Sequence, residues 1–138
     1  MTRINLTVLS LILLGIAYGS QPANAEHLHN HLFEQRVYTT APGKLDNLNE
    51  RFRDHTNYLF VKHGMKLIGY WTPVDQPDTL IYILAYPSRD AREASWKAFV
   101  ADPAWKKARQ ESLDKAGGTI VTDVKSTFMT PTDYSPLR

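Results

Sequence analysis

The feature that most constrains the fold is a pair of apolar segments close together in the chain. Leu80–Tyr86 is apolar at every position, and Met65–Thr72 is nearly so. A strand covered on one side alternates apolar and polar residues, whereas a strand without this alternation is covered on both sides. We therefore predict two strands of a hairpin that are buried on both faces. In so short a chain, we expect the second cover to come from another subunit.

The first 25 residues are predicted to be a signal peptide rather than part of the fold. Arg3 gives a basic start, residues 4–17 are mostly apolar, and Ala23-Asn24-Ala25 places small residues where a signal peptidase cleaves. The apolar run is shorter than the ~20 residues that span a bilayer, and a retained membrane anchor is the alternative. We expect cleavage after Ala25 and an exported protein, periplasmic or secreted, that is free of the membrane.

Composition limits the rest of the chain to a few classes. We predict a flexible, histidine-containing leader at 26–31 and one domain at 32–138. The chain has 16 Lys and Arg against 14 Asp and Glu, and the two signs are interspersed, so nucleic-acid binding is not expected. It has no cysteine, which excludes disulfides, iron–sulfur clusters, thiol nucleophiles and a lipid-modified cysteine.

The residue pattern predicts the element order β-α-β-β-α-(α)-β. The expected strands are residues 32–40, 65–72, 79–86 and 119–129. The expected helices are residues 44–63, ended by Gly64, a second from the cap Ser88 to about Ala101, and a short third from Asp102-Pro103 to Gly117-Gly118. This order is the α+β, ferredoxin-like fold, with a four-stranded antiparallel sheet.

The predicted fold leaves one face of the sheet bare, because both main helices must lie on the other. The bare face carries either Ile81, Ile83 and Ala85 or the alternate set from Leu80 to Tyr86. The hairpin loop at 73–78 leaves this register open by one residue. Either set is too apolar to face water. We therefore predict a homodimer that pairs the two sheets face to face.

An ordered set of segments resembles the NIPSNAP family, and the resemblance spans residues 33–136. The segments, besides the apolar third strand, are Tyr38–Leu45, Arg51–His55, His63–Met65, Gly69–Thr72, Ala94–Phe99, Asp102–Trp105 and Thr130–Pro136. The resemblance implies the dimeric α/β barrel superfamily, in agreement with the bare sheet face. That superfamily includes cofactor-independent monooxygenases and haem proteins, but the family itself implies no particular chemistry.

The resemblance also implies that a pocket would lie between the helices and the sheet. The candidate lining residues are His55, His63, Tyr70, Trp71, Tyr82 and Trp96. His55 and His63 are the candidate catalytic residues, because histidine exchanges protons near neutral pH. The ordinary explanation is an exposed flank for His55 and a helix C-terminus for His63. The aromatic residues either line an apolar ligand cavity or fill the core and the dimer interface.

His27, His29 and His31 alternate near the predicted new N-terminus. In an extended chain they point to one side, where three imidazoles suit copper, zinc or nickel. The alternative is a solvated leader, which we favour, and we expect no metal and no cofactor.

These observations lead to three functional hypotheses. The first is an exported homodimer of uncharacterised activity that binds a small apolar ligand or a protein partner. The second is a cofactor-independent monooxygenase-like enzyme acting on an aromatic or quinone-like substrate, with His55 or His63 as the base. The third is haem binding through one of these two histidines.

Overall fold

The computed structural model describes residues 31–137. The expected signal segment, 1–25, and the leader up to residue 30 lie outside the described residues. In the part of the chain that is described, no helix is both long and apolar enough to cross a membrane.

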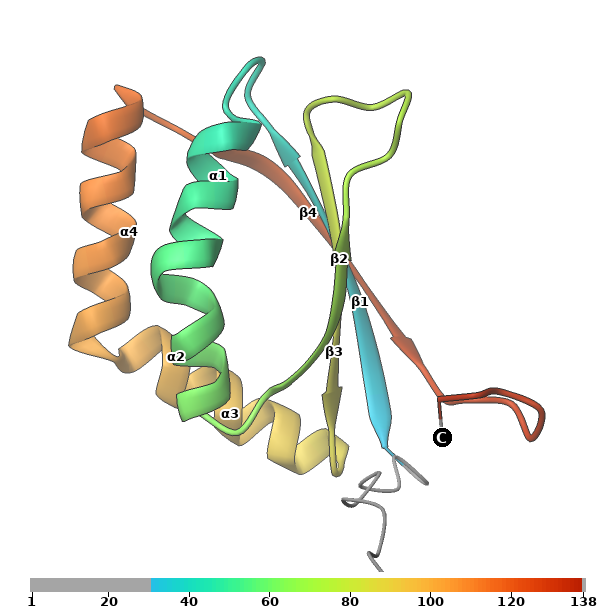
Figure 1. The fold of residues 1–138 in the computed structure, drawn as a ribbon. Helices are drawn as coiled ribbons and strands as arrows, with labels where there is room; N and C mark the ends of the chain where they lie inside the picture. The colour runs from blue at the N-terminus through green and yellow to red at the C-terminus, as the bar shows by residue number, and fades with distance from the viewer. Residues whose placement is uncertain (1–30, 138) are drawn as a thin grey trace, which may run out of the picture.

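The observed element order confirms the ferredoxin-like prediction. The elements are β1 (Leu32–Thr40), α1 (Leu45–Arg51), η1 (Phe52–Thr56), α2 (Asn57–Lys62), β2 (Lys66–Trp71), β3 (Thr79–Tyr86), α3 (Arg89–Ala101), α4 (Pro103–Ala116) and β4 (Val121–Met129). The strands form one sheet in the order β2-β3-β1-β4, and every neighbouring pair is antiparallel. Figure 1 shows the helices on one side of this sheet.

Local capping explains where the helices begin and end. The Ala91 amide donates to the Ser88 hydroxyl at 3.1 Å, and the Ala104 amide donates to an Asp102 carboxylate oxygen at 2.8 Å. Gly64, at φ 78°, follows the first helix, and Gly117, at φ 71°, ends α4. An L residue with a side chain rarely adopts this left-handed conformation, which is why both positions carry glycine.

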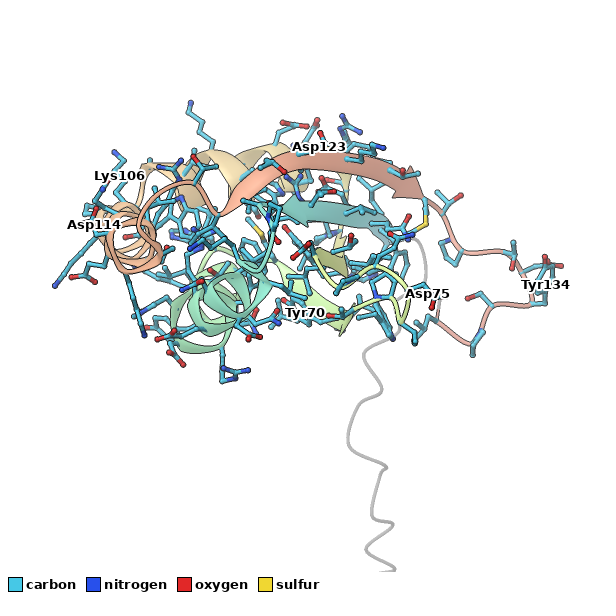
Figure 2. All side chains as sticks on the ribbon, turned by 90° about the horizontal axis from the view of Figure 1, so that it is seen from above. Tyr70, Asp75, Lys106, Asp114, Asp123 and Tyr134 are labelled. Carbon is cyan, nitrogen blue, oxygen red and sulfur yellow. The ribbon has the colours of Figure 1, made fainter. Side chains whose placement is uncertain are left out.

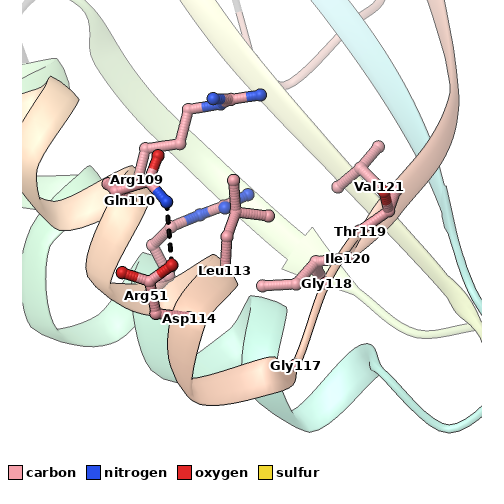
Figure 3. Close-up of a pocket in the computed structure, with 10 residues that line it drawn as sticks. All are labelled: Arg51, Arg109, Gln110, Leu113, Asp114, Gly117, Gly118, Thr119, Ile120 and Val121. Atoms are coloured by element: carbon pink, nitrogen blue, oxygen red, sulfur yellow. Dashed lines mark hydrogen bonds between the residues drawn. The ribbon is translucent and has the colours of Figure 1, made fainter.

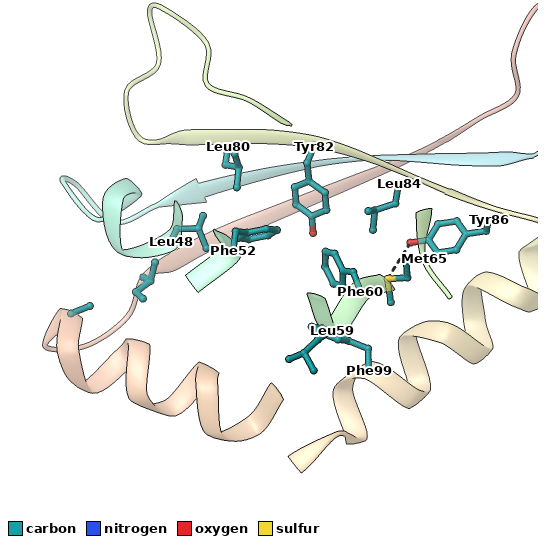
Figure 4. Packing of buried hydrophobic residues seen from close by; sticks show 12 residues of the cluster. Leu48, Phe52, Leu59, Phe60, Met65, Leu80, Tyr82, Leu84, Tyr86 and Phe99 are labelled. Atoms are coloured by element: carbon teal, nitrogen blue, oxygen red, sulfur yellow. Dashed lines mark hydrogen bonds between the residues drawn. The ribbon is translucent and has the colours of Figure 1, made fainter. Parts of the chain in front are cut away.

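The strand register decides which face of β3 meets the helices. Tyr82 pairs with Tyr70 of β2 and Arg36 of β1, and it is fully buried in the core on the helix side. The alternating residues Leu80, Leu84 and Tyr86 share that side. The core also contains Leu48, Phe52, Leu59, Phe60, Met65 and Phe99 (Figure 4).

The other side of the sheet, here called the open face, carries the second apolar set. Its partly exposed apolar residues are Val37, Ile68, Trp71, Ile81 and Ile83. The Trp71 ring lies against Gly69, where an added Cβ would come within 2.6 Å of it. The C-terminal segment reaches the end of this face near Phe33 and Met129. From there it extends outward past Tyr134, beyond the sheet (Figure 2).

Candidate functional site

A cleft of about 290 Å³ lies between the helices and the sheet. Its lining comes from the first helical segment, α3, α4 and strands β1 and β4. The lining residues are Tyr38, Arg51, Phe52, Thr56, Phe60, Trp96, Phe99, Val100, Trp105, Arg109, Val121 and Val124. We refer to this space as the aromatic cleft. It lies in the layer where the fold resemblance implied a pocket.

Packed rings fix the walls of the aromatic cleft. The Phe99 ring lies 4.5 Å from Trp105, 4.8 Å from Phe60 and 5.6 Å from Trp96, measured between ring centroids. Phe60 in turn contacts Phe52 edge-on at 6.0 Å. Tilted and edge-on arrangements are favourable for aromatic pairs. The walls are therefore held by mutual contacts among residues from three different helical segments.

The first helix contains a π-helical segment, η1, at the point where it borders the cleft. The Thr56 hydroxyl donates to the Arg51 carbonyl at 3.2 Å, five residues back. Arg51, Phe52 and Thr56 are all buried, and all three line the cleft. A π-helical segment widens the turn by one residue and is found frequently at functional sites. Apolar spacing predicted an uninterrupted α-helix here, so this segment is a finding of the structure.

A second, more polar cavity of about 620 Å³ adjoins the aromatic cleft. The two share Arg51, Arg109 and Val121 as lining residues. Figure 3 shows the Arg51 and Arg109 side chains extending from α1 and α4 in the same direction, toward the sheet. Asp114 also lines the polar cavity, and it accepts a hydrogen bond from Gln110 at 2.8 Å.

The Arg51 guanidinium is buried without a carboxylate partner in the described chain. Only 6% of the residue is exposed. Its Nη1 donates to the Ser112 hydroxyl at 3.0 Å, its Nε is buried without a hydrogen-bond partner, and its Cζ lies 5.5 Å from the Trp105 ring centroid. Burial, together with the nearby positive charge of Arg109, lowers the pKa of Arg51.

A charged cluster around Glu34 lies beside the cleft, between β1, β4 and α3. The Glu34 carboxylate is fully buried and accepts from Arg36 at 2.7 Å, from Arg92 at 2.7 and 3.0 Å, from Ser126 at 2.6 Å and from Tyr86 at 3.1 Å. Burial alone would raise the pKa of Glu34. The hydrogen bonds from Arg92, Ser126 and Arg36 outweigh burial and lower this pKa to about 2.

The Glu34 cluster positions one wall of the cleft. The Trp96 indole donates to the Tyr86 hydroxyl at 2.8 Å, and the Arg36 guanidinium lies 4.3 Å from the Trp96 ring centroid. Arg36 also donates to the Tyr38 hydroxyl at 3.3 Å. Trp96 and Tyr38 both line the cleft. The charged cluster thus fixes the orientation of two aromatic lining residues through hydrogen bonds and a cation–π contact.

The structure brings only part of the predicted pocket set together. Trp96 lines the aromatic cleft. Tyr82 lies in the core beside it, with its ring 5.1 Å from Phe52, and Tyr70 stacks on Tyr82 at 5.5 Å but lines a different small cavity, with Asn49 and Leu80. The Tyr70 and Tyr82 hydroxyls are both buried without a hydrogen-bond partner among residues 31–137. Burial raises the pKa of each phenol.

Trp71 and His55 do not line the aromatic cleft. Trp71 is on the open face and is 51% exposed. Strand alternation places its side chain opposite to that of Tyr70, so the two cannot line the same pocket. His55 is an exposed residue of η1 and lines a separate cavity of about 100 Å³ with Lys115 and Glu111 of α4.

His63 joins the end of the first helix to the α3–α4 junction. Its Nε2 lies 2.8 Å from an Asp102 carboxylate oxygen, and Lys62 donates to the same oxygen at 2.7 Å. The hydrogen bond from Lys62 and then that from His63 hold the pKa of Asp102 well below its usual range. His63 packs near Phe99, with the ring centroids 6.3 Å apart. His63 is the C-cap residue of α2, and it does not line the cleft.

The three leader histidines lie mostly outside the described residues. His27 and His29 are not described, and the His31 Nδ1 is buried without a hydrogen-bond partner in the described part. Within residues 31–137, no group of three His, Cys, Asp or Glu side chains is arranged to hold a metal ion. The metal hypothesis for the three histidines therefore stays a prediction.

Sequence reasoning missed the charged residues of the site. Glu34, Arg36 and Tyr38 occupy alternate positions of β1, so their side chains share one face of the strand. Because that face meets the helices, the alternation was a readable signal for a buried ion pair. No comparable signal joins Arg51 with Arg109, since the two meet only through tertiary packing of α1 against α4.

Fold and cleft together define a ferredoxin-like α+β domain with a hollow between its helices and its sheet. A model of the NIPSNAP family matches residues 33–136. The chain belongs to the NIPSNAP family, as the ordered sequence segments predicted. No curated protein matches the chain.

Solved structures of similar proteins support the fold. A NIPSNAP family protein with unknown function from Agrobacterium tumefaciens is 22% identical, with 80% of this chain and 96% of that one covered and a TM-score of 0.69. An uncharacterized NIPSNAP-like domain protein from Burkholderia xenovorans is 17% identical, with coverage of 78% and 90% and a TM-score of 0.67. SnoaB, a cofactor-independent oxygenase from Streptomyces nogalater, is 13% identical, with coverage of 78% and 98% and a TM-score of 0.54. At these identities the likeness shows the fold alone.

Replacing Glu34 by Gln is predicted to destabilise the domain by about 3 kcal/mol, because it removes the buried charge that binds Arg36 and Arg92 and leaves Arg36 without a carboxylate partner among the described residues. Since folding lowers the pKa of Glu34 from 4.5 to about 2, its contribution is complete above pH 4.5. It is lost as the pH falls toward 2. Urea unfolding at several pH values should therefore show a shallower loss of stability between pH 5 and 2 in E34Q than in the wild type.

Glu93→Gln is the matched control, because Glu93 contacts Arg92 at 3.3 Å from an exposed position. Its effect should stay within about 0.5 kcal/mol. Equal destabilisation by both variants, or an unchanged acid slope in E34Q, would show that the buried cluster does not carry this stability.

Proposed function

We propose that the domain binds a small apolar ligand in the aromatic cleft. The observation that supports this is the cleft itself: about 290 Å³ of space with walls formed largely by Phe52, Phe60, Trp96, Phe99 and Trp105. Ligand pockets are concave, mostly apolar and equipped with a few polar groups. The buried arginine at its edge supplies such a group.

The cleft favours binding over histidine-dependent chemistry. No histidine of residues 31–137 lines it, because His55 is exposed on η1 and His63 is engaged with Asp102. The monooxygenase-like alternative therefore has no histidine base in the cleft, and haem would find no histidine ligand there. The likeness to SnoaB extends to the fold and carries no residue of an active site.

We also propose that two copies pair through the open face, as the apolar residues there suggest. Val37, Ile81 and Trp71 lie side by side across three neighbouring strands. Apolar residues that are contiguous over a sheet mark an interaction surface, and a second copy presents a patch of the same chemistry under two-fold symmetry. If the open face binds a different protein instead, the purified chain should be a monomer.

Filling the cleft is predicted to abolish ligand binding without unfolding the domain. Val124 lines the cleft, faces the helices and is 42% exposed, so a tryptophan there has room to enter the space. For V124W we expect at least about tenfold weaker binding of the neutral fluorescent probe N-phenyl-1-naphthylamine, a loss of about 1.4 kcal/mol. Val74→Trp, at a loop position that is 97% exposed, is the matched control. A wild type that does not bind the probe, or equal binding by V124W, would contradict the proposal.

A lysine on the open face is predicted to separate the subunits. Ile81→Lys places a charge at the centre of the proposed interface, where its burial is unfavourable. We expect dimerisation at least about a hundredfold weaker, equivalent to about 3 kcal/mol, measured by analytical ultracentrifugation. Val61→Lys is the control, because Val61 is 58% exposed on α2. A wild type that sediments as a monomer at micromolar concentration would rule out this interface.

We further propose that residues 1–25 direct export and are removed after Ala25, so that the domain works outside the cytoplasm. This rests on the residue pattern of that segment, a basic start, an apolar run and small residues before the cleavage point. Expression of the full chain in a bacterial host should release a periplasmic protein that begins at Glu26. N-terminal sequencing that finds Met1 on a membrane-bound product would favour a retained anchor instead.

A further inference from the structure

Arg51 is the least compensated buried charge of the described structure. The partly buried cationic groups at this side of the sheet, Arg36 and Arg92, are bound to the Glu34 carboxylate. Arg51 has one hydroxyl acceptor, Ser112, and no carboxylate in the part of the chain described. A guanidinium taken out of water without a counter-charge costs several kcal/mol. A buried guanidinium beside a cavity, without a carboxylate partner in the described chain, is therefore suited to bind an anionic group of a ligand.

The second cation of this region lies at the rim of the same space. Arg109 is exposed on α4 and borders both the aromatic cleft and the polar cavity, as Arg51 does. Both residues thus border the aromatic space and the polar one. Asp114 is the one carboxylate in the described lining of these two cavities, and it is hydrogen-bonded to Gln110 and to neither arginine among the described residues. The boundary between the two cavities is therefore positively charged.

Building on the proposed function, we infer that the ligand is an apolar monocarboxylate whose body lies in the aromatic cleft and whose carboxylate meets Arg51 and Arg109. The Nε side of Arg51 is unused, and a guanidinium edge binds a carboxylate through two parallel hydrogen bonds. The aromatic walls suit a small ring system. Arg109 closes the site from the solvent side, where its exposed side chain can follow the ligand.

Two probes with the same apolar body test this inference. Naphthalene-2-carboxylate and naphthalene-2-carboxamide differ in charge but hardly in shape, and both are measured by displacement of the neutral fluorescent probe N-phenyl-1-naphthylamine from the purified protein. The wild type should bind the carboxylate at least about tenfold more tightly at neutral pH, as expected for charge-assisted hydrogen bonds. Arg51→Met and Arg109→Met should each reduce this preference several-fold and leave binding of the amide within about twofold.

The matched control is Arg53→Met, which removes the same charge from an exposed position outside the aromatic cleft. R51M should unfold at a denaturant concentration no lower than the wild type, because the charge that it removes is buried and unpaired. If R51M does not fold, R109M alone tests the carboxylate preference, because a substitution at the exposed Arg109 should not prevent folding.

The outcomes separate this inference from the proposed function. Equal binding of the two probes by the wild type overturns the carboxylate preference and leaves the apolar cleft standing. A preference that survives in both R51M and R109M, or that R53M reduces equally, overturns the assignment to these two arginines. Failure of the wild type to bind either probe or the fluorescent reporter overturns the cleft and the carboxylate site together.

Discussion

Strand β3 is the element on which the rest of the domain depends. It lies between β1 and β2 and carries Leu80, Tyr82, Leu84 and Tyr86 under the helices. Ile81 and Ile83 face the opposite way. A strand that is apolar on both sides is stable in water only if both sides are covered. The helices provide one cover, and this demand is the physical reason for expecting a second copy on the open face.

Sequence alone predicted most of the fold because its signals were local. The observed bounds of β1 and β3 coincide with the predicted ones, and Ser88, Asp102, Gly64 and Gly117 lie where capping chemistry placed them. The π-helical segment η1 had no such signal. Apolar residues spaced to fit an uninterrupted α-helix remain compatible with one wider turn.

The site was less predictable, because it is assembled from long-range contacts. The six pocket candidates were chosen by side-chain type, although alternation along β2 already places Tyr70 and Trp71 on opposite faces. The strand register then decided that Tyr70, and not Trp71, shares the helix side with Tyr82. This register was the one feature that the hairpin loop left open. Trp96 is held through Tyr86 and Arg36 by Glu34. The alternation along β1 predicts these contacts of Glu34 and Arg36 only when it is known which side of the strand faces the helices.

The Glu34 cluster and Arg51 differ in how far the protein itself compensates a buried charge. The Glu34 cluster satisfies its carboxylate with five hydrogen bonds, so its desolvation is compensated within the protein. Arg51 lacks this compensation in the described chain, although an apolar side chain of similar length would fill the same space at lower cost. Sequences violate local rules of this kind mainly at functional sites. Because the violation lies at an open cleft bordered by a second arginine, an anionic group on a small ligand is the simplest compensation that the structure admits.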